Sequence, residues 1–179
     1  MKINFYALKA IYLHEMDRFR RTLTQSLLSP VLTTSLYFIV FGSVIGGYVD
    51  KIDGVSYGSY IVPGLLMLTL LTQSISNTSF GIFFPKFNGT IYEILAAPIS
   101  TFEVVLAFVG AGATKTLIVS IVIFITSLFF VDVQVKYPLL MIFLLILVAF
   151  TFALFGFLIG LMSSDFEQMS IIPTLFITP

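Results

Sequence analysis

The sequence places a single charged side chain, Lys115, inside its long apolar runs. A charge at the centre of a bilayer costs at least about 2.5 kcal/mol, so residues of this kind usually serve binding or transport. The apolar run around Lys115 extends from about Ser100 to Val131, which exceeds the roughly 20 residues that a membrane span needs. The side chain can therefore also reach the membrane surface along its helix. A place on a transport pathway and a role as an anchor both stay open.

Small polar side chains recur at helical spacing within the second apolar run. The stripe consists of Thr69, Thr72, Gln73, Ser76 and Ser79. Lipid offers no hydrogen-bonding partners to these groups, so we expect the stripe to face protein or water. Hydroxyls of this kind commonly serve helix packing, and a substrate-facing position is the alternative.

Residues for enzymatic or metal chemistry are scarce. The chain has no cysteine and one histidine, His14, so disulfides, thiolate sites and a metal-binding cluster are not expected. Nine Lys and Arg balance nine Asp and Glu, which argues against nucleic-acid binding. No glycine is followed by lysine, which excludes a Walker A phosphate loop from this sequence. No acidic residue lies within the long apolar runs, so we expect no proton relay there. These absences predict no catalytic residue and favour an ATPase subunit in trans as the source of energy.

Long apolar runs define the elements that would position these side chains. The chain is 58% hydrophobic and 10% charged, whereas a soluble domain carries roughly 25% charge. Runs of about 20 residues predict transmembrane helices at 31–48, 61–84, 104–131 and 139–162, and the start of a fifth helix at 169–179. The expected fold is an all-α membrane protein.

Prolines mark the expected helix boundaries. Pro30 opens the first span, Pro63 lies in the first turn of the second, and Pro85 closes the second. Pro138 precedes the fourth span, and Pro173 predicts a kink early in the fifth run. Glycine pairs at 42/46 and 156/160 permit close helix contact but are weak evidence for any particular dimer.

Residues 2–29 predict an amphipathic helix that precedes the first span. Its apolar stripe contains Phe5, Leu8, Tyr12, Met16, Phe19, Leu23 and Leu27. Basic side chains flank the stripe at Lys2, Lys9 and Arg20, while His14, Arg18, Arg21 and Gln25 point away from it. This arrangement favours a helix that lies in the plane of the membrane, with basic residues at the lipid phosphates. A helix that packs on a partner protein is the alternative, and both can hold together. His14 is expected to be solvated.

A short helix is expected within residues 88–98, where Asn88 or Thr90 can cap its start and Pro98 ends it. Its exposed face would carry apolar Ile91, Tyr92 and Leu95 beside Glu93. A partner protein can cover such a face, and insertion of the same side chains into lipid is the alternative.

The distribution of basic residues predicts the orientation of the chain. With the N-terminus inside, the cytoplasmic side holds Lys2, Lys9, Arg18, Arg20, Arg21 and Lys86, and the outside holds Lys51 and Lys136. This asymmetry favours a cytoplasmic N-terminus.

Several short motifs, in their order and spacing, give the chain a family resemblance. They are Leu36–Gly42 with Ile45 and Gly46, Tyr60–Leu65, Glu93–Pro98, Ser127–Val131, Pro173 with Thr174, and Thr178 with Pro179. Together they make the chain resemble the permease subunit of ABC-2 type transporters over essentially its whole length.

The resemblance implies roles for two segments. Residues 88–98 would be the coupling helix that docks on a cytoplasmic nucleotide-binding ATPase subunit, with Tyr92, Glu93, Ile94, Leu95 and Pro98 at the contact. The amphipathic helix would be the interfacial connecting helix, held at the lipid surface by its apolar stripe and by Arg18, Arg20 and Arg21.

The resemblance also implies an assembly and a location. Two permeases and two ATPases would export a hydrophobic or amphipathic molecule across the bacterial inner membrane. ATP would be used by the partner subunit, and the permease itself would bind no cofactor. Family permeases have six spans, so the sequence is expected to be a truncated permease. An ion-coupled secondary transporter and a non-transporting membrane scaffold are the alternative functions.

Overall fold

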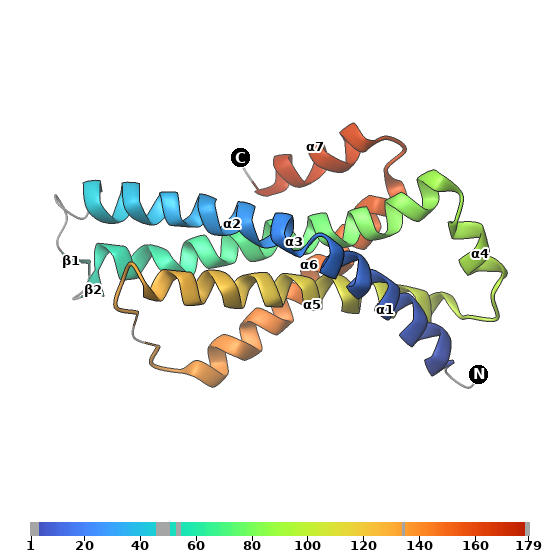
Figure 1. Ribbon diagram of the computed structural model, residues 1–179, viewed down its shortest axis with the longest axis horizontal. Coiled ribbons are helices and arrows are strands. Elements are labelled where there is room, and N and C mark those ends of the chain that lie inside the picture. The colour runs from blue at the N-terminus through green and yellow to red at the C-terminus, as the bar shows by residue number, and fades with distance from the viewer. Residues whose placement is uncertain (1–3, 46–50, 53–54, 134, 178–179) are drawn as a thin grey trace.

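Helices make up nearly all of the described chain in the computed structural model (Figure 1), which describes residues 4–45, 51–52, 55–133 and 135–177. In chain order the elements are α1 (Phe5–Arg21), α2 (Leu23–Tyr37), the π-helix η1 (Phe38–Ile45), β1 (Lys51–Ile52), β2 (Val55–Ser56), α3 (Tyr57–Asn88), α4 (Ile91–Ala96), α5 (Thr101–Leu128), α6 (Pro138–Met162) and α7 (Phe166–Ile177). Lys2, residues 46–50 with Gly46, and residues 178–179 lie outside the described part, as do the surroundings of Gly42 and the side chain of Pro173.

Within the described residues, four segments are long and apolar enough to cross a membrane: Leu23–Phe41, which joins α2 to the start of η1, and the helices α3, α5 and α6. The 32 residues of α3 correspond to about 48 Å of helix, and the 28 residues of α5 to about 42 Å. Both exceed the roughly 30 Å of a bilayer core. The expectation of an all-α membrane protein is confirmed at this level.

Helix boundaries differ from those expected from the prolines. Pro30 is buried inside α2, which already begins at Leu23, and Pro85 lies inside α3, which ends at Asn88 and is capped by Gly89 with φ of 80°. Pro63 is the seventh residue of α3 rather than part of its first turn. The helix α7 begins at Phe166 and continues through position 173. Membrane helices tolerate interior prolines because neighbouring groups satisfy the freed carbonyls.

The core lies where α3, α5 and α6 pack together (Figure 1). Buried Leu70, Phe108, Ala149 and Phe157 belong to it. Gly156 and Gly160 of α6 lie directly against the backbone of α3: an added Cβ would stand 2.5 Å from the carbonyl oxygen of Ile75 or Ser79, respectively. The glycine pair therefore serves packing inside the chain, because only a missing side chain permits this approach.

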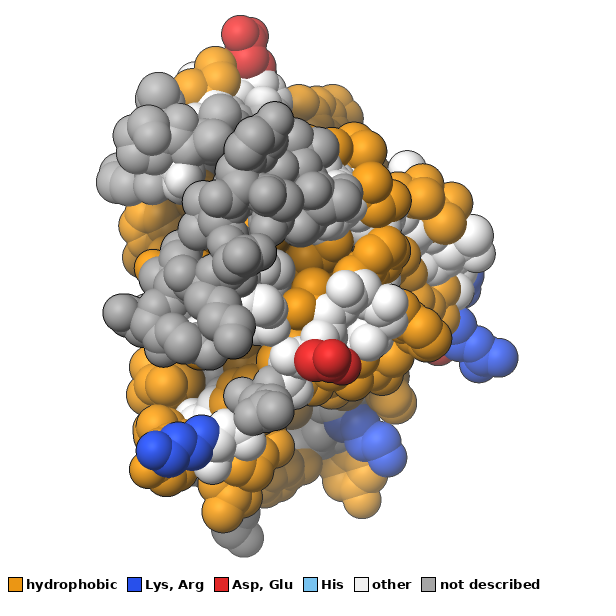
Figure 2. Space-filling model, turned by 90° about the vertical axis from the view of Figure 1, so that its left-hand side faces the viewer, with side chains coloured by type: hydrophobic (Ala, Val, Ile, Leu, Met, Phe, Trp, Pro, Cys, Tyr) orange, Lys and Arg blue, Asp and Glu red, His pale blue; other side chains and the backbone are white. Residues whose placement is uncertain are grey.

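The bundle has two distinct ends. The start of α1 and the helix α4 lie at one end, called here the α4 end, and the short strands lie at the other, the hairpin end (Figure 1). The strands were not expected from the sequence; β1 and β2 pair antiparallel, with Lys51 opposite Ser56. Figure 2 views the hairpin end, where hydrophobic side chains dominate the described surface and charged ones are few and separated.

At the α4 end, α3 fixes the end of α6 and the start of α7. The Lys86 Nζ donates to the carbonyl oxygens of Leu161 and Ser163, at 2.7 and 2.8 Å. A cation here satisfies carbonyls that the helix leaves open at its C-terminus. Phe166 packs edge-on against Phe83 and Phe87, with ring centroids 4.8 and 5.0 Å away.

Candidate functional site

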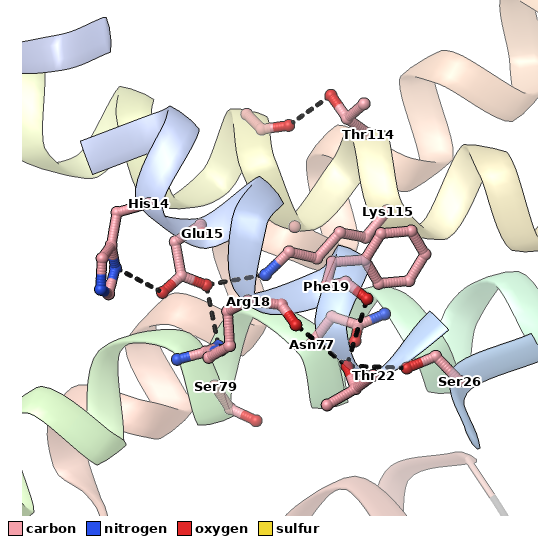
Figure 3. Close-up of polar contacts among 12 residues, drawn as sticks. His14, Glu15, Arg18, Phe19, Thr22, Ser26, Asn77, Ser79, Thr114 and Lys115 are labelled. Carbon is pink, nitrogen blue, oxygen red and sulfur yellow. Dashed lines mark hydrogen bonds and ion pairs between the residues drawn. The ribbon is translucent and has the colours of Figure 1, made fainter. Parts of the chain in front are cut away.

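Lys115 lies in a buried ion cluster with two residues of α1 (Figure 3). Its Nζ is 2.7 Å from Oε2 of Glu15, and the same oxygen is 2.8 Å from a terminal nitrogen of Arg18. The side chains of Lys115 and Glu15 are each 3% exposed. The Lys115 side chain thus ends on Glu15 inside the protein. Charges as deeply buried as these must be paired, because each alone would lose its hydration without compensation.

Glu15, which was not among the expected site residues, is the carboxylate that pairs with Lys115. Lys115 is the fifteenth residue of the 28 in α5, so its partner lies beside the middle of that helix. The available signal was position: Glu15 falls between Tyr12, Met16 and Phe19, within the apolar stripe of α1. A carboxylate on an apolar face and a solitary lysine in a span are each costly, and together they indicate a pair.

The helix α1 runs alongside α5 in the same direction, from Glu103 near its start to Val119 in its second half. The hydroxyl of Tyr12 donates to Oγ1 of Thr114 at 3.1 Å, and the backbone N–H of Asn4 donates to Oε1 of Glu103. Glu103 also caps its own helix, because its Oε2 accepts from the backbone N–H of Ser100 at 2.7 Å. One buried carboxylate therefore joins the start of α1 to the start of α5.

The apolar stripe of α1 faces the protein along much of its length. Phe19 is buried, and it packs with Met16, Val119 and Ile123. Leu8 and Tyr12 are half-buried, whereas Phe5 is 70% exposed. Because α5 covers this face, it is not the face that a helix in the membrane plane would turn toward lipid. The interfacial position of α1 stays a proposal that rests on its outer face.

The basic and polar residues of α1 and α2 divide differently from the expectation. Arg18 was expected to point away from the stripe but turns inward, with its guanidinium 5.4 Å from the ring centroid of Phe80. Gln25 faces a pocket in the protein. Arg20 and Arg21 are exposed, and the side chain of His14 is 79% exposed.

The cluster borders a cavity of about 610 Å³, called here the cation pocket. Its lining residues are Arg18, Phe19, Thr22, Gln25, Ser26, Thr72, Ser76, Asn77, Ser79, Phe80, Lys115, Met169, Ser170 and Ile177. They come from α1, α2, α3, α5 and α7, together with Thr22 at the junction of α1 and α2. Figure 3 shows several of these polar side chains around the ion cluster. The structure therefore brings Lys115 and part of the predicted stripe to one site.

The polar stripe of α3 lines two neighbouring pockets. Thr72 and Ser76 line the cation pocket, while Thr69, Thr72 and Gln73 line a smaller cavity of about 240 Å³ against α2. The hydroxyls of Thr69 and Thr72 donate to carbonyl oxygens of their own helix, at 2.9 and 2.8 Å. Each hydroxyl thus uses its hydrogen in a bond within α3. Its oxygen can still accept a hydrogen bond.

A third cavity, of about 860 Å³, lies at the hairpin end between α3, α5 and α6. Its wall is mainly apolar, with Asp132 and Lys136 among its polar members. None of the predicted pathway residues lines it, whereas Val62 and Pro63 of the Tyr60–Leu65 motif do.

The helix α4 projects from the bundle at the α4 end (Figure 1). Tyr92 is 73% exposed and Leu95 is 67% exposed, and Glu93 and Pro98 are also exposed. Ile94 and Ile91 are half-buried and pack against the core, so Ile91 does not belong to the exposed face that the sequence suggested. The stub thus turns Tyr92 and Leu95 outward on a base that the core holds.

Comparisons with known proteins assign the chain to a family. The sequence model of the ABC-2 type transporter membrane family matches residues 6–179. The chain is 38% identical, over all 179 residues, to the inner membrane transport permease YadH of Escherichia coli K12, and equally to that of Shigella flexneri. The match covers 70% of the length of each relative. No solved structure matches the chain. Because the family match spans nearly every residue, this chain belongs to the ABC-2 type transporter family and is a membrane transport permease.

Proposed function

We propose that the chain is the membrane-spanning subunit of an ATP-driven exporter and that α4 docks on a separate cytoplasmic ATPase subunit. The observation that carries the proposal is the exposure of Tyr92 and Leu95 on a stub whose other side is anchored in the core. Two large apolar side chains exposed on a six-residue helix are suited to a partner's groove. Permeases of this family typically work with an ATPase partner, which supports the same role.

The orientation follows from this proposal. The α4 end would face the cytoplasm, with the start of α1 and Lys9 on that side, while Arg20 and Arg21 lie at the other end of α1. Basic residues concentrate on the cytoplasmic side of membrane proteins. The relatives are inner membrane permeases, which supports a bacterial inner membrane location for this chain.

The transport pathway would follow the polar stripe of α3. Thr69, Thr72, Gln73 and Ser76 line two neighbouring cavities beside α2, and Lys115 borders the wider one. We propose that a hydrophobic or amphipathic substrate passes here. A second copy of the chain would complete the pathway, since only 17% of the Leu23–Phe41 window is buried within one chain.

The test replaces Leu95 with Ala and measures how much ATPase subunit copurifies with the membrane-inserted permease. A buried leucine contributes about 1.5 to 3 kcal/mol, so we expect association to fall at least about ten-fold. Substrate-dependent ATP hydrolysis should fall with it. Glu93→Gln should weaken coupling in the same direction.

Leu139→Ala is the matched control, because Leu139 is 83% exposed at the hairpin end of α6. It should leave association unchanged. Equal association for wild type and Leu95→Ala would count against docking through α4. It would also count against the proposed orientation, because a stub on the outer side of the membrane cannot reach a cytoplasmic ATPase.

A further inference from the structure

The cation pocket has an unbalanced charge. Arg18 and Lys115 line it, whereas no Asp or Glu is among its described lining residues. Glu15 lies behind the two cations and offers them one shared oxygen, Oε2. Two cations against one carboxylate leave a formal charge of +1 beside a cavity in a membrane protein. An anion in the cavity would complete the pairing that burial demands.

Both cations have donors left for such an anion. Lysine carries three N–H donors and arginine five. Within the described parts of the chain, Glu15 is the one carboxylate that pairs with either cation. Arg18 lies over the Phe80 ring and pairs with Glu15, and Lys115 is buried, so the donors are preorganised. Preorganised charged donors are favourable for binding phosphate or carboxylate groups.

The rest of the lining is amphipathic. Hydroxyl and amide groups, such as those of Ser76 and Gln25, lie in the same cavity as apolar Phe80 and Met169. A small inorganic anion would use the polar part alone. A volume of about 610 Å³ is in the range of roughly 300 to 1,000 Å³ typical of pockets for whole organic ligands.

We propose that the cation pocket binds an anionic amphiphile, with a phosphate or carboxylate head group at Arg18 and Lys115 and an apolar chain along Phe80 and Met169. The binding site stands on the geometry of the pocket. The further statement that this amphiphile is the exported cargo rests on the exporter function proposed above.

The experiment uses the full chain, purified in a nonionic detergent, and measures binding by isothermal titration calorimetry. Dodecyl phosphate is the main probe. Dodecylphosphocholine has the same chain but a cancelled head-group charge, and inorganic phosphate has the charge but no chain. We expect dodecyl phosphate to bind at least about ten-fold more tightly than either comparison probe, because charged hydrogen bonds and apolar burial both contribute to its binding.

Arg18→Gln should weaken dodecyl phosphate binding about ten-fold or more, since Lys115 and Glu15 then neutralise each other. Arg20→Gln removes the same charge from an exposed position of the same helix and should change nothing. Arg18→Lys should restore most of the affinity and shows that a loss in Arg18→Gln is not a folding defect. Elution of all variants as one monodisperse species confirms that each is folded.

Three outcomes would overturn the proposal: equal binding of dodecyl phosphate and dodecylphosphocholine, equal binding of dodecyl phosphate and inorganic phosphate, or equal losses in Arg18→Gln and Arg20→Gln. Leu95→Ala separates this proposal from the exporter function. If Arg18→Gln loses binding while Leu95→Ala keeps its ATPase association, the pocket stands and docking fails. If Arg18→Gln keeps binding while Leu95→Ala loses its ATPase association, the binding proposal fails and docking stands.

Discussion

The helix α3 has two faces that carry similar small polar residues but meet different surroundings. Toward α6, Ser74 is fully buried and its hydroxyl donates to the carbonyl oxygen of Ala149 at 2.6 Å. On the face that lines the cavities beside α2, Thr72 is exposed and its hydroxyl donates to its own helix, at Leu68. One face is closed by a neighbour, and the other borders cavities.

This difference shows that the composition of a span does not by itself assign a hydroxyl to packing or to a pathway. The helix that lies opposite determines which of the two roles a hydroxyl has. The helix α6 offers Gly156 and Gly160, which let its backbone approach α3, whereas the cavities separate the other face from α2. A closed face contributes to stability, and an open face is available for binding.

The largest expected effect comes from opening the closed face with the double substitution Gly156→Ala and Gly160→Ala. Each new Cβ would stand 2.5 Å from a backbone oxygen of α3, so the two helices must separate. Overpacking costs about 1 to 3 kcal/mol per site, and we expect a loss of about 4 kcal/mol in the free energy of unfolding. Equilibrium unfolding in mixed micelles with sodium dodecyl sulfate measures it.

Gly64→Ala is the control for that change. Gly64 is an exposed glycine of α3 with no atom within 4 Å of an added Cβ. Alanine is the better helix former, so this variant should match the wild type or gain up to about 1 kcal/mol. If Gly64→Ala and the double variant lost equal stability, the close contact of α3 with α6 would not be the source of stability at this face.

A smaller effect is expected at the ion cluster, where α1 packs beside the open face of α3. Glu15→Gln leaves Lys115 and Arg18 without their carboxylate, and removing one partner of a buried pair costs about 3 to 5 kcal/mol. Arg18 is partly exposed and the cation pocket adjoins Lys115, so we expect the lower value, about 3 kcal/mol. The same micellar unfolding experiment measures it.

Two further variants show whether charge is the cause. Asp17→Asn removes an exposed carboxylate of the same helix and should leave stability unchanged. The double substitution Glu15→Met and Lys115→Met removes both buried charges, and it should recover most of the stability because apolar replacements of a buried pair are often neutral. If Glu15→Gln and Asp17→Asn lost equal stability, the buried ion cluster would not be the cause of the loss.

The sequence was sufficient to predict helices but not their neighbours. Apolar runs indicate where a chain crosses lipid, because the bilayer requires long, internally bonded segments. The stripe of α1 could not reveal whether lipid or protein covers it, since both favour the same side chains. The partner of Lys115 was hidden for that reason, although Glu15 interrupts the stripe. Likewise, Gly156 and Gly160 permit close contact with any helix, and only the fold shows that α3 is the one they meet.

The smallest expected effect compares single hydroxyls on the two faces. Ser74→Ala removes a buried bond between helices and leaves the carbonyl of Ala149 without that donor, so we expect a loss of about 1 kcal/mol. Thr72→Val removes a bond within α3 on the open face and should change stability by less than about 0.5 kcal/mol. Unfolding of the two variants, measured side by side, resolves this difference. Equal losses would mean that α2 closes its face of α3 as tightly as α6 does, and the cavities there would then be unavailable to a ligand.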